Sequence, residues 1–282
     1  MSRLIRIVHT TGYRYEEGAT SSFNEARMTP RSTREQLVLS STVAITPTPW
    51  VHRYVDYWGT QVDSFEVHER HTRLNVVATS TVEVERHAAD PRRLSWDEMR
   101  DRALLDASSE WLEVSARVDP GPELAAIAED AAARAPSPAD CVAPILAAIA
   151  DRVRYVKGST DVHAEARTSW NARAGVCQDM VHLMLGALRS VGIPARYVSG
   201  YVMPGDRLVV GERCTGESHA WLQYWDGAWI GLDPANEGEA PGESHVEVGV
   251  GRDYGDVPPL RGIYTGSGES DMYVEVEMTL VG

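Results

Sequence analysis

The spacing of apolar residues changes along the chain, from alternation in the first third to helical spacing in the middle and back to alternation. Residues 3–15, 37–45, 62–67 and 74–84 are rich in β-branched residues and alternate between apolar and polar positions. Trp58-Gly59-Thr60 has the composition of a turn between strands. Repeated short strands without helical spacing predict a β-rich, sandwich-like or partly closed antiparallel domain.

A polar segment, residues 86–95, interrupts this pattern and contains Pro91. We place a domain boundary there, which divides the chain into a β-rich N-terminal domain, residues 1–90, and a second domain, residues 91–282.

The second domain begins with helices. Alanine-rich spacing predicts helices over 122–135 and 138–154, and Ser137 supplies a capping hydroxyl to the second of them. Pro144 is expected to kink that helix or to shift its beginning. Residues 156–174 have the composition of a loop.

Another helix opens at Cys177. Gly192 and Pro194 end it, because glycine readily terminates a helix and proline restricts the residue before it. Its apolar residues recur at spacings of three and four, at Val181, Met184, Leu185, Leu188 and Val191. This spacing predicts one buried face.

Alternation returns after this helix. The predicted strands are 195–202, 218–224, 228–233, 246–250 and 272–281. Helices followed by antiparallel strands make the second domain α+β.

Composition and charge narrow the choice of partners. The chain has 282 residues, of which 43% are hydrophobic and 24% charged, an ordinary balance for a globular protein. Its net charge is −14, from 27 basic and 41 acidic residues, and the sequence contains no basic tract. We therefore expect neither nucleic acid nor an anionic membrane surface as a partner.

The sequence also bears on location. No apolar run is long enough to span a bilayer, and the first residues read as a strand rather than a signal peptide. Cys141, Cys177 and Cys214 cannot all pair with one another, and no disulfide framework is indicated. These features favour a cytoplasmic location.

The candidate chemistry centres on Cys177. A thiol at a helix N-terminus lies at the positive end of the helix dipole, which favours the nucleophilic thiolate. A thiolate needs a base, and the base needs an orienting partner. His219 lies near the start of one predicted strand and Asp233 at the end of the next.

The turn at Trp225-Asp226-Gly227 decides whether these two side chains can meet. A two-residue loop at Asp226-Gly227 would place Asp233 on the face opposite His219. A three-residue loop with Gly227 in the left-handed conformation would place Asp233 directly across from His219. We expect the three-residue loop, because only that geometry allows a carboxylate–imidazole hydrogen bond.

Several motifs together resemble the bacterial transglutaminase-like proteins. They are Gly175-Val176-Cys177-Gln178-Asp179, residues 192–201, Ser218-His219-Ala220-Trp221, Leu232-Asp233-Pro234-Ala235-Asn236, and, in the flanking regions, residues 24–30, 56–59 and 251–259. The resemblance covers nearly the whole chain. It implies a papain-like catalytic fold, with Cys177 as nucleophile, His219 as base and Asp233 as the orienting carboxylate.

The function that follows is a cysteine enzyme that acts on amide or isopeptide bonds of a peptide or protein substrate through a thioester. We favour hydrolysis, because the sequence shows no recognisable calcium-binding loop or amine-donor site. The alternatives are transglutaminase-type acyl transfer to an amine and a noncatalytic peptide-binding module. No cofactor or metal is expected, and the sequence does not give the oligomeric state.

Other residues invite competing interpretations. His68 and His71 are interpreted as a solvated strand end rather than a metal site. His182 is interpreted as a packed histidine rather than a second base. Two Cys-x4-His pairs, at 177–182 and 214–219, raise a zinc hypothesis, but a helix turns Cys177 and His182 about 140° apart.

The oxyanion hole is expected to use the backbone N–H of Cys177 as its first donor. The sequence leaves the second donor open among five residues. They are Tyr155, Ser159, Thr160, Trp170 and Asn171.

Overall fold

The computed structural model describes residues 2–87, 91–205 and 209–282 of the chain. Its strands are β1 (Arg3–Ala26), β2 (Gln36–Thr46), β3 (Trp50–Val55), β4 (Gln61–Val67), β5 (His71–Val84), β6 (Arg154–Tyr155), β7 (Ala174–Gly175), β8 (Ala195–Val202), β9 (Arg213–Thr215), β10 (Glu217–Trp225), β11 (Trp229–Leu232), β12 (His245–Gly251), β13 (Leu260–Gly266) and β14 (Ser270–Leu280). Its helices are α1 (Trp96–Met99), α2 (Arg102–Ala107), α3 (Ser109–Leu112), α4 (Gly121–Arg134), α5 (Pro138–Arg152), α6 (Ala166–Ala172), α7 (Cys177–Ser190) and the 3-10 turn η1 (Tyr254–Asp256).

The long strand β1 organises an eight-stranded antiparallel sheet. Its first half lies between β5 and β14, and its second half lies between β4 and β13. The pairing of β1 with β5 shifts register between Arg14 and Ala19, where the partners of the strand change. The β-rich N-terminal region expected from alternation is confirmed, and its strands belong to a single hydrogen-bonded sheet.

Strands from the end of the chain complete this sheet. β14 pairs with β1 from Ile5–Leu280 to Tyr15–Ser270, and β9 adds a short edge beyond β14. Residues 272–281 were expected among the strands of the second domain, but as β14 they belong to the large sheet. Alternation identifies a strand but does not say which sheet it joins.

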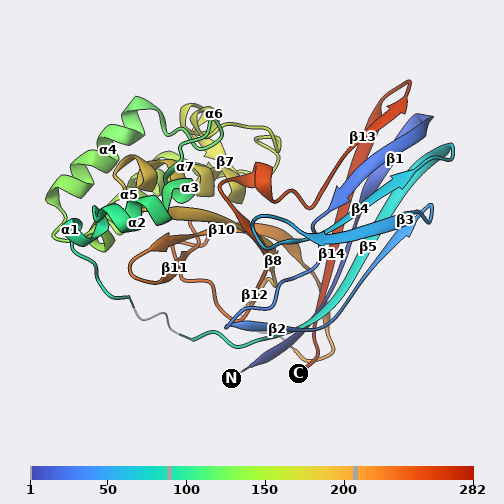
Figure 1. Ribbon diagram of the computed structural model, residues 1–282, viewed down its shortest axis with the longest axis horizontal. Coiled ribbons are helices and arrows are strands. Elements are labelled where there is room, and N and C mark those ends of the chain that lie inside the picture. Colours follow the sequence, from blue (N-terminus) through green and yellow to red (C-terminus); the bar gives the residue numbers. More distant parts are fainter. Residues whose placement is uncertain (1, 88–90, 206–208) are drawn as a thin grey trace.

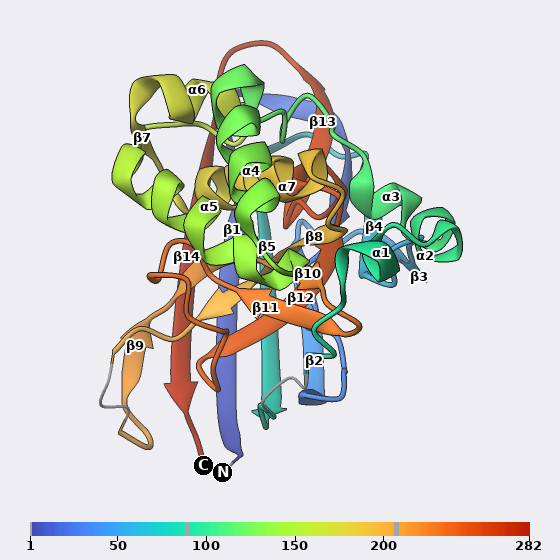
Figure 2. The same cartoon turned by 90° about the vertical axis from the view of Figure 1, so that its left-hand side faces the viewer.

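The two ends of the chain lie side by side as a result (Figures 1 and 2), with Leu4 N 2.7 Å from Gly282 O. The division into residues 1–90 and 91–282 stays a prediction, and residues 88–90 at its boundary lie outside the described residues.

The second sheet, in the order β11-β10-β8-β12, carries helices on one face (Figure 1). The expected helices at 122–135, 138–154 and from Cys177 are present as α4, α5 and α7. α5 begins at Pro138 and runs through Pro144. α6 lies in the segment expected to be a loop. The apolar face of α7, including Leu183, packs on Ala220 and Leu222 of β10.

The opposite face of the second sheet packs against the large sheet, so the molecule has three layers (Figure 1). Tyr201 and Val246 of the second sheet share a buried cluster with Ile7 and Met278 of the large sheet. This contact holds the large sheet beside the strands that carry His219.

Candidate active site

Cys177 is the first residue of α7, and a buried carboxylate orders the turn before it. Oδ2 of Asp179 accepts the backbone N–H of Val176 at 2.7 Å and the hydroxyl of Thr160 at 2.6 Å. Asp179 is fully buried, so these bonds replace the water that the carboxylate loses. Beyond complementing the helix dipole, this side chain positions the backbone at Cys177.

The hairpin β10–β11 differs in register from the expected one. Trp225 pairs with Trp229, so the turn holds three residues, Asp226-Gly227-Ala228, and Gly227 has φ of +78°. The expected turn length and glycine conformation are present, but the turn lies one residue further along the chain. Asp233 therefore lies nearer Trp221 than directly across from His219, which corrects the expected pairing.

The linker between the two parts of the chain anchors this turn. Oδ1 of the buried Asp226 accepts the backbone N–H of Leu94 at 2.7 Å, and its carbonyl accepts that of Arg92 at 3.0 Å. These tertiary bonds fix the position of the turn, and no local pattern in the hairpin encodes them.

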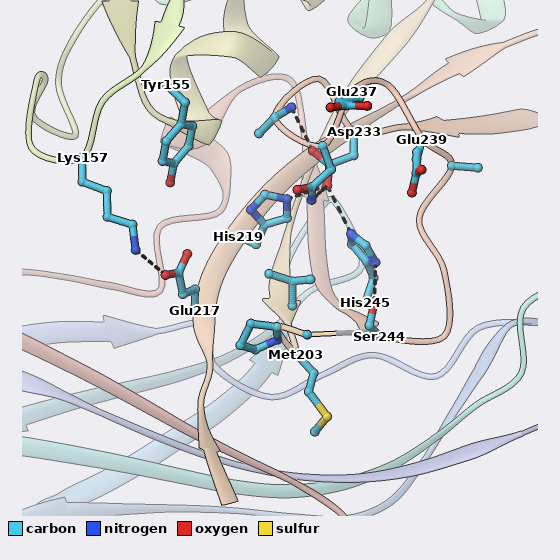
Figure 3. Close-up of a pocket in the computed structure, with 16 residues that line it drawn as sticks. Tyr155, Lys157, Met203, Glu217, His219, Asp233, Glu237, Glu239, Ser244 and His245 are labelled. Atoms are coloured by element: carbon cyan, nitrogen blue, oxygen red, sulfur yellow. Dashed lines mark hydrogen bonds and ion pairs between the residues drawn. The ribbon is translucent and has the colours of Figure 1, made fainter. Parts of the chain in front are cut away.

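An odd number of turn residues still keeps the two side chains on one face. Nε2 of His219 lies 2.6 Å from Oδ2 of Asp233, and both side chains are buried (Figure 3). Burial opposes the charged imidazole, but contacts with Asp233 and Cys177 raise the pKa of His219 to about 10. Burial likewise opposes the carboxylate, and hydrogen bonds from the two histidines His219 and His245 hold the pKa of Asp233 below its usual range.

Cys177 and His219 line the same cavity, of about 510 Å³, between α7, β10 and the large sheet. Cys177 is partly buried and remains reachable from this cavity. On the other side of the imidazole, a cavity of about 720 Å³ is lined by His219, Asp233 and the acidic side chains Glu217 and Glu237 (Figure 3). The structure thus brings the three candidate residues Cys177, His219 and Asp233 together.

His245, which no sequence motif indicated, also contacts the carboxylate of Asp233. Its Nε2 lies 3.2 Å from Oδ2 of Asp233, while its Nδ1 accepts the backbone N–H of Gly242 at 3.2 Å. Because Nδ1 accepts, Nε2 carries the proton and donates it to Asp233. The ring of Trp221 packs near both histidines, 5.3 Å from His245 and 6.2 Å from His219 between centroids.

Asn236 adds a third bond to the same oxygen, with Nδ2 at 2.7 Å. Asn236 belongs to one of the motifs that carry the family resemblance, but no role was expected for it. No local sequence signal links His245 to Asp233, because β12 reaches the site by pairing with β8.

The other candidate ligands and bases lie in separate environments. His182 is fully buried, and burial lowers its pKa to about 3. Cys214 lies in β9 and contacts the carbonyl of Met278. His68 is exposed and bonds Glu66, as expected for a solvated strand end. His71 was expected to be solvated too, but it is buried at the start of β5, and its Nδ1 bonds the carbonyl of Glu69. The four residues of the zinc hypothesis therefore do not form one site.

Among the described residues, His219, Asp233 and His245 form the group whose ligand atoms lie close enough for a metal, within 4.8 Å of one another. Their contacts have hydrogen-bond lengths, and Oδ2 of Asp233 already accepts three donors. The group is accounted for as a hydrogen-bond network.

Of the five candidates for the second oxyanion donor, Tyr155 lines the cavity that contains Cys177. The hydroxyl of Thr160 bonds Asp179, and the indole N–H of Trp170 bonds Glu123. Tyr155 is thus the candidate that faces the thiol's cavity.

Comparison with known proteins places the chain in a family. Residues 5–83 match the bacterial transglutaminase-like N-terminal region, and residues 125–234 match the transglutaminase-like superfamily. An uncharacterized protein of Mycobacterium leprae is 43% identical over 98% of both chains. A protein-glutamine gamma-glutamyltransferase of Pseudomonas aeruginosa is 26% identical over 50% of this chain and 22% of its own length.

The crystal structure of a candidate cysteine protease from Cytophaga hutchinsonii has the same fold. It covers 100% of this chain and 92% of its own, with a TM-score of 0.77 and 20% identity. Motifs, fold and relatives agree, and the chain belongs to the transglutaminase-like superfamily, with the β-rich N-terminal region that accompanies its bacterial members.

Proposed function

We propose that the protein is a cysteine hydrolase that cleaves an amide or isopeptide bond of a peptide or protein through a thioester. The observation that supports this most is the series of contacts from the partly buried thiol of Cys177 to His219 and on to the buried carboxylate of Asp233. A noncatalytic binding module would have no need for a buried ion pair beside a reachable thiol.

In the first half of the reaction the sulfur of Cys177 attacks the carbonyl carbon. A histidine with a pKa of about 10 is protonated at neutral pH, and the imidazolium of His219 beside the sulfur favours the thiolate. The oxyanion forms next to the backbone N–H of Cys177, with the hydroxyl of Tyr155 as the proposed second donor. The intermediate collapses to a thioester as His219 gives its proton to the leaving amine.

In the second half His219, now neutral, takes a proton from water as the water attacks the thioester carbonyl. The carboxylic acid leaves and the sulfur departs as thiolate, which restores the ion pair. Asp233 keeps the imidazole oriented throughout by binding Nε2. Nδ1 is then the nitrogen that faces the sulfur and exchanges the proton with the amine and the water.

Acyl transfer to an amine is the second candidate. It would replace water with a primary amine, and the similarity to the Pseudomonas aeruginosa gamma-glutamyltransferase favours it. The two reactions share every step up to the thioester.

The first experiment asks whether Cys177 is activated. We expect iodoacetamide to alkylate Cys177 at a rate that is still high near pH 6, with the modified residue identified by peptide mass mapping. A rate that rises only near the ~8.5 of a free thiol would favour the binding module.

The second experiment separates hydrolysis from transfer. Protein is incubated with a mixture of blocked peptides, with and without an excess of a fluorescent primary amine. New carboxyl termini would support hydrolysis, whereas incorporation of the amine at the expense of those termini would support transfer. Cys177→Ala is the blank for both products.

A cytoplasmic location is part of the proposal, motivated by the three free thiols Cys141, Cys177 and Cys214. No helix among the described residues is long and apolar enough to cross a membrane. Cell fractionation with an antibody to the protein tests the location.

A further inference from the structure

The last strand of the chain exposes apolar side chains beside the candidate nucleophile. One face of β14 carries Leu280, Met278 and Val276, which are buried against the second sheet or beside it. The same face continues to Val274 and Met272, where the second sheet no longer covers it. These two side chains are 49% and 51% exposed, and both line the cavity that contains Cys177.

Exposing the apolar side chains of Val274 and Met272 to water is unfavourable, and a ligand that covered them would remove this free-energy cost. Apolar surface that lines a concave site next to a reactive group is typical of a binding site. Two charged groups that line this cavity, Lys157 and Glu217, pair with each other at 2.5 Å. Glu275 of β14 also lines it, but its side chain belongs to the opposite face of the strand from Val274 and Met272.

At Met272 and Val274, no strand that the structure describes pairs with the edge of β14 that faces away from β1. β9 pairs with β14 only at Glu277–Thr279 within the described part of the chain. The carbonyl of Val276 accepts the N–H of Gly216 on the side away from β1. Because backbone groups of alternate residues in a strand point to the same side, those of Val274 and Met272 face the open edge as well. An open edge can add an extended peptide as a further strand.

We propose that this stretch of β14 binds the acyl part of the substrate as an extended peptide, with an apolar side chain close to the reacting carbonyl seated on Val274 and Met272. The inference rests on the proposed function. The acyl part stays attached to Cys177 after the amine has left, so a wall continuous with the sulfur's cavity can hold it through both halves of the reaction. The large sheet would then select the substrate, although it supplies no reacting group.

The test compares two neutral probes of nearly the same shape. Blocked Leu-Ala and Asn-Ala chloromethyl ketones differ in the polarity of one side chain, and both alkylate an active-site thiol. We expect the leucine probe to inactivate the protein at least about tenfold faster, the ratio that burial of one large apolar side chain would give.

Two variants locate the effect. Met272→Gln combined with Val274→Thr keeps the shape of the wall and makes it polar, and should lower the leucine rate about tenfold while the asparagine rate stays constant. Ile263→Thr on β13, which replaces an apolar side chain that is 72% exposed and lies outside this cavity, is the matched control and should change neither rate. The rate with iodoacetamide should be the same in all three proteins.

Equal rates for the two probes, or a preference for leucine that survives in the double variant, would overturn this inference while the iodoacetamide rate still supported the proposed function. Failure of all three reagents to modify Cys177 selectively would overturn the proposed function, and this inference with it.

Discussion

Nε2 of His245 lies 3.2 Å from Oδ2 of Asp233, the same oxygen that Nε2 of His219 approaches to 2.6 Å. The carboxylate is therefore shared by two imidazoles, and only His219 also borders the cavity of Cys177. The backbone N–H of Gly242 fixes the tautomer of His245. This arrangement gives the two histidines different roles, with His219 as the proposed proton carrier and His245 as a positioning residue for Asp233.

We expect Cys177→Ala and His219→Ala each to lower turnover about a millionfold, because either change removes a group that every step uses. The double variant should be no worse than either single one. Turnover of a peptide identified in the incubation described above is the measurement.

Cys141→Ala and Cys214→Ala are the controls for this prediction. Cys141 is buried in α5 and Cys214 lies in β9, so both variants should keep full turnover. Appreciable activity in Cys177→Ala would contradict the proposed mechanism outright.

Asp233→Ala should be milder, with turnover reduced about ten-thousandfold, because a carboxylate that orients a base helps the reaction without taking part in bond making. The variant also leaves His219 and His245 buried without their acceptor, so its melting temperature should fall. A variant as inactive as Cys177→Ala would indicate that the carboxylate does more than orient the imidazole.

His245→Ala should lower turnover about tenfold, through loss of one hydrogen bond to a charged acceptor. His245→Gln, which keeps an N–H donor, should recover part of the loss. Because the lost bond favours the ionised carboxylate, the acid limb of the pH–rate profile should move to higher pH in the alanine variant.

His68→Ala is the matched control, since Nε2 of the exposed His68, directly after β4, also bonds a carboxylate, that of Glu66 at 2.8 Å. A purely structural role for His245 would change the melting temperature but leave the pH–rate profile where it was.

The pattern of apolar residues was sufficient to predict α7 and its first residue, because Gly192 and Pro194 end the helix. The expectation of a single buried face was wrong: α7 is buried all round from Gln178 to Arg189, because α4, α5 and α6 pack around it as well as β8 and β10. It also predicted which face of the hairpin carries Asp233, since that depends only on whether the turn is odd or even. The exact register depended on the bond between Asp226 and Leu94, which joins residues far apart in the sequence. The pairing of β14 with β1 escaped prediction for the same reason. His245 lies only 12 residues after Asp233, and it escaped prediction because β12 pairs with β8 rather than with the neighbouring β11.

The His219–Asp233 pair should make stability depend on pH in a defined window. The pKa of His219 rises from 6.5 to about 10 on folding, so its contribution is fully present below pH 6.5 and is lost as the pH rises toward 10. The pKa of Asp233 falls below 3.8, so its contribution is present above that pH and is lost as the solution becomes more acidic. The pair therefore stabilises the fold most between about pH 4 and 6.5.

Thermal unfolding of the parent protein and of His219→Gln across this range measures the effect. We expect the difference in melting temperature to be largest near pH 6 and to shrink steadily up to pH 9.5. His163→Gln, which replaces an exposed histidine in the loop before α6, is the control. A difference for His219→Gln that stays constant with pH would show that the imidazole and the carboxylate are not coupled in this way.

Tyr155 gives the most direct test of the oxyanion site. Its hydroxyl belongs to a side chain that lines the cavity of Cys177 and is 41% exposed, so Tyr155→Phe removes one oxygen without disturbing the core. Loss of one oxyanion donor should lower kcat about a hundredfold, because the donor acts on charge that develops only in the transition state. The rate of Cys177 alkylation by iodoacetamide should not change, since that reaction forms no oxyanion. Tyr57→Phe, at an exposed tyrosine whose hydroxyl bonds Glu110, is the control and should keep full activity. Normal kcat in Tyr155→Phe would exclude this hydroxyl as the second donor and leave the backbone N–H of Cys177 to act with another group.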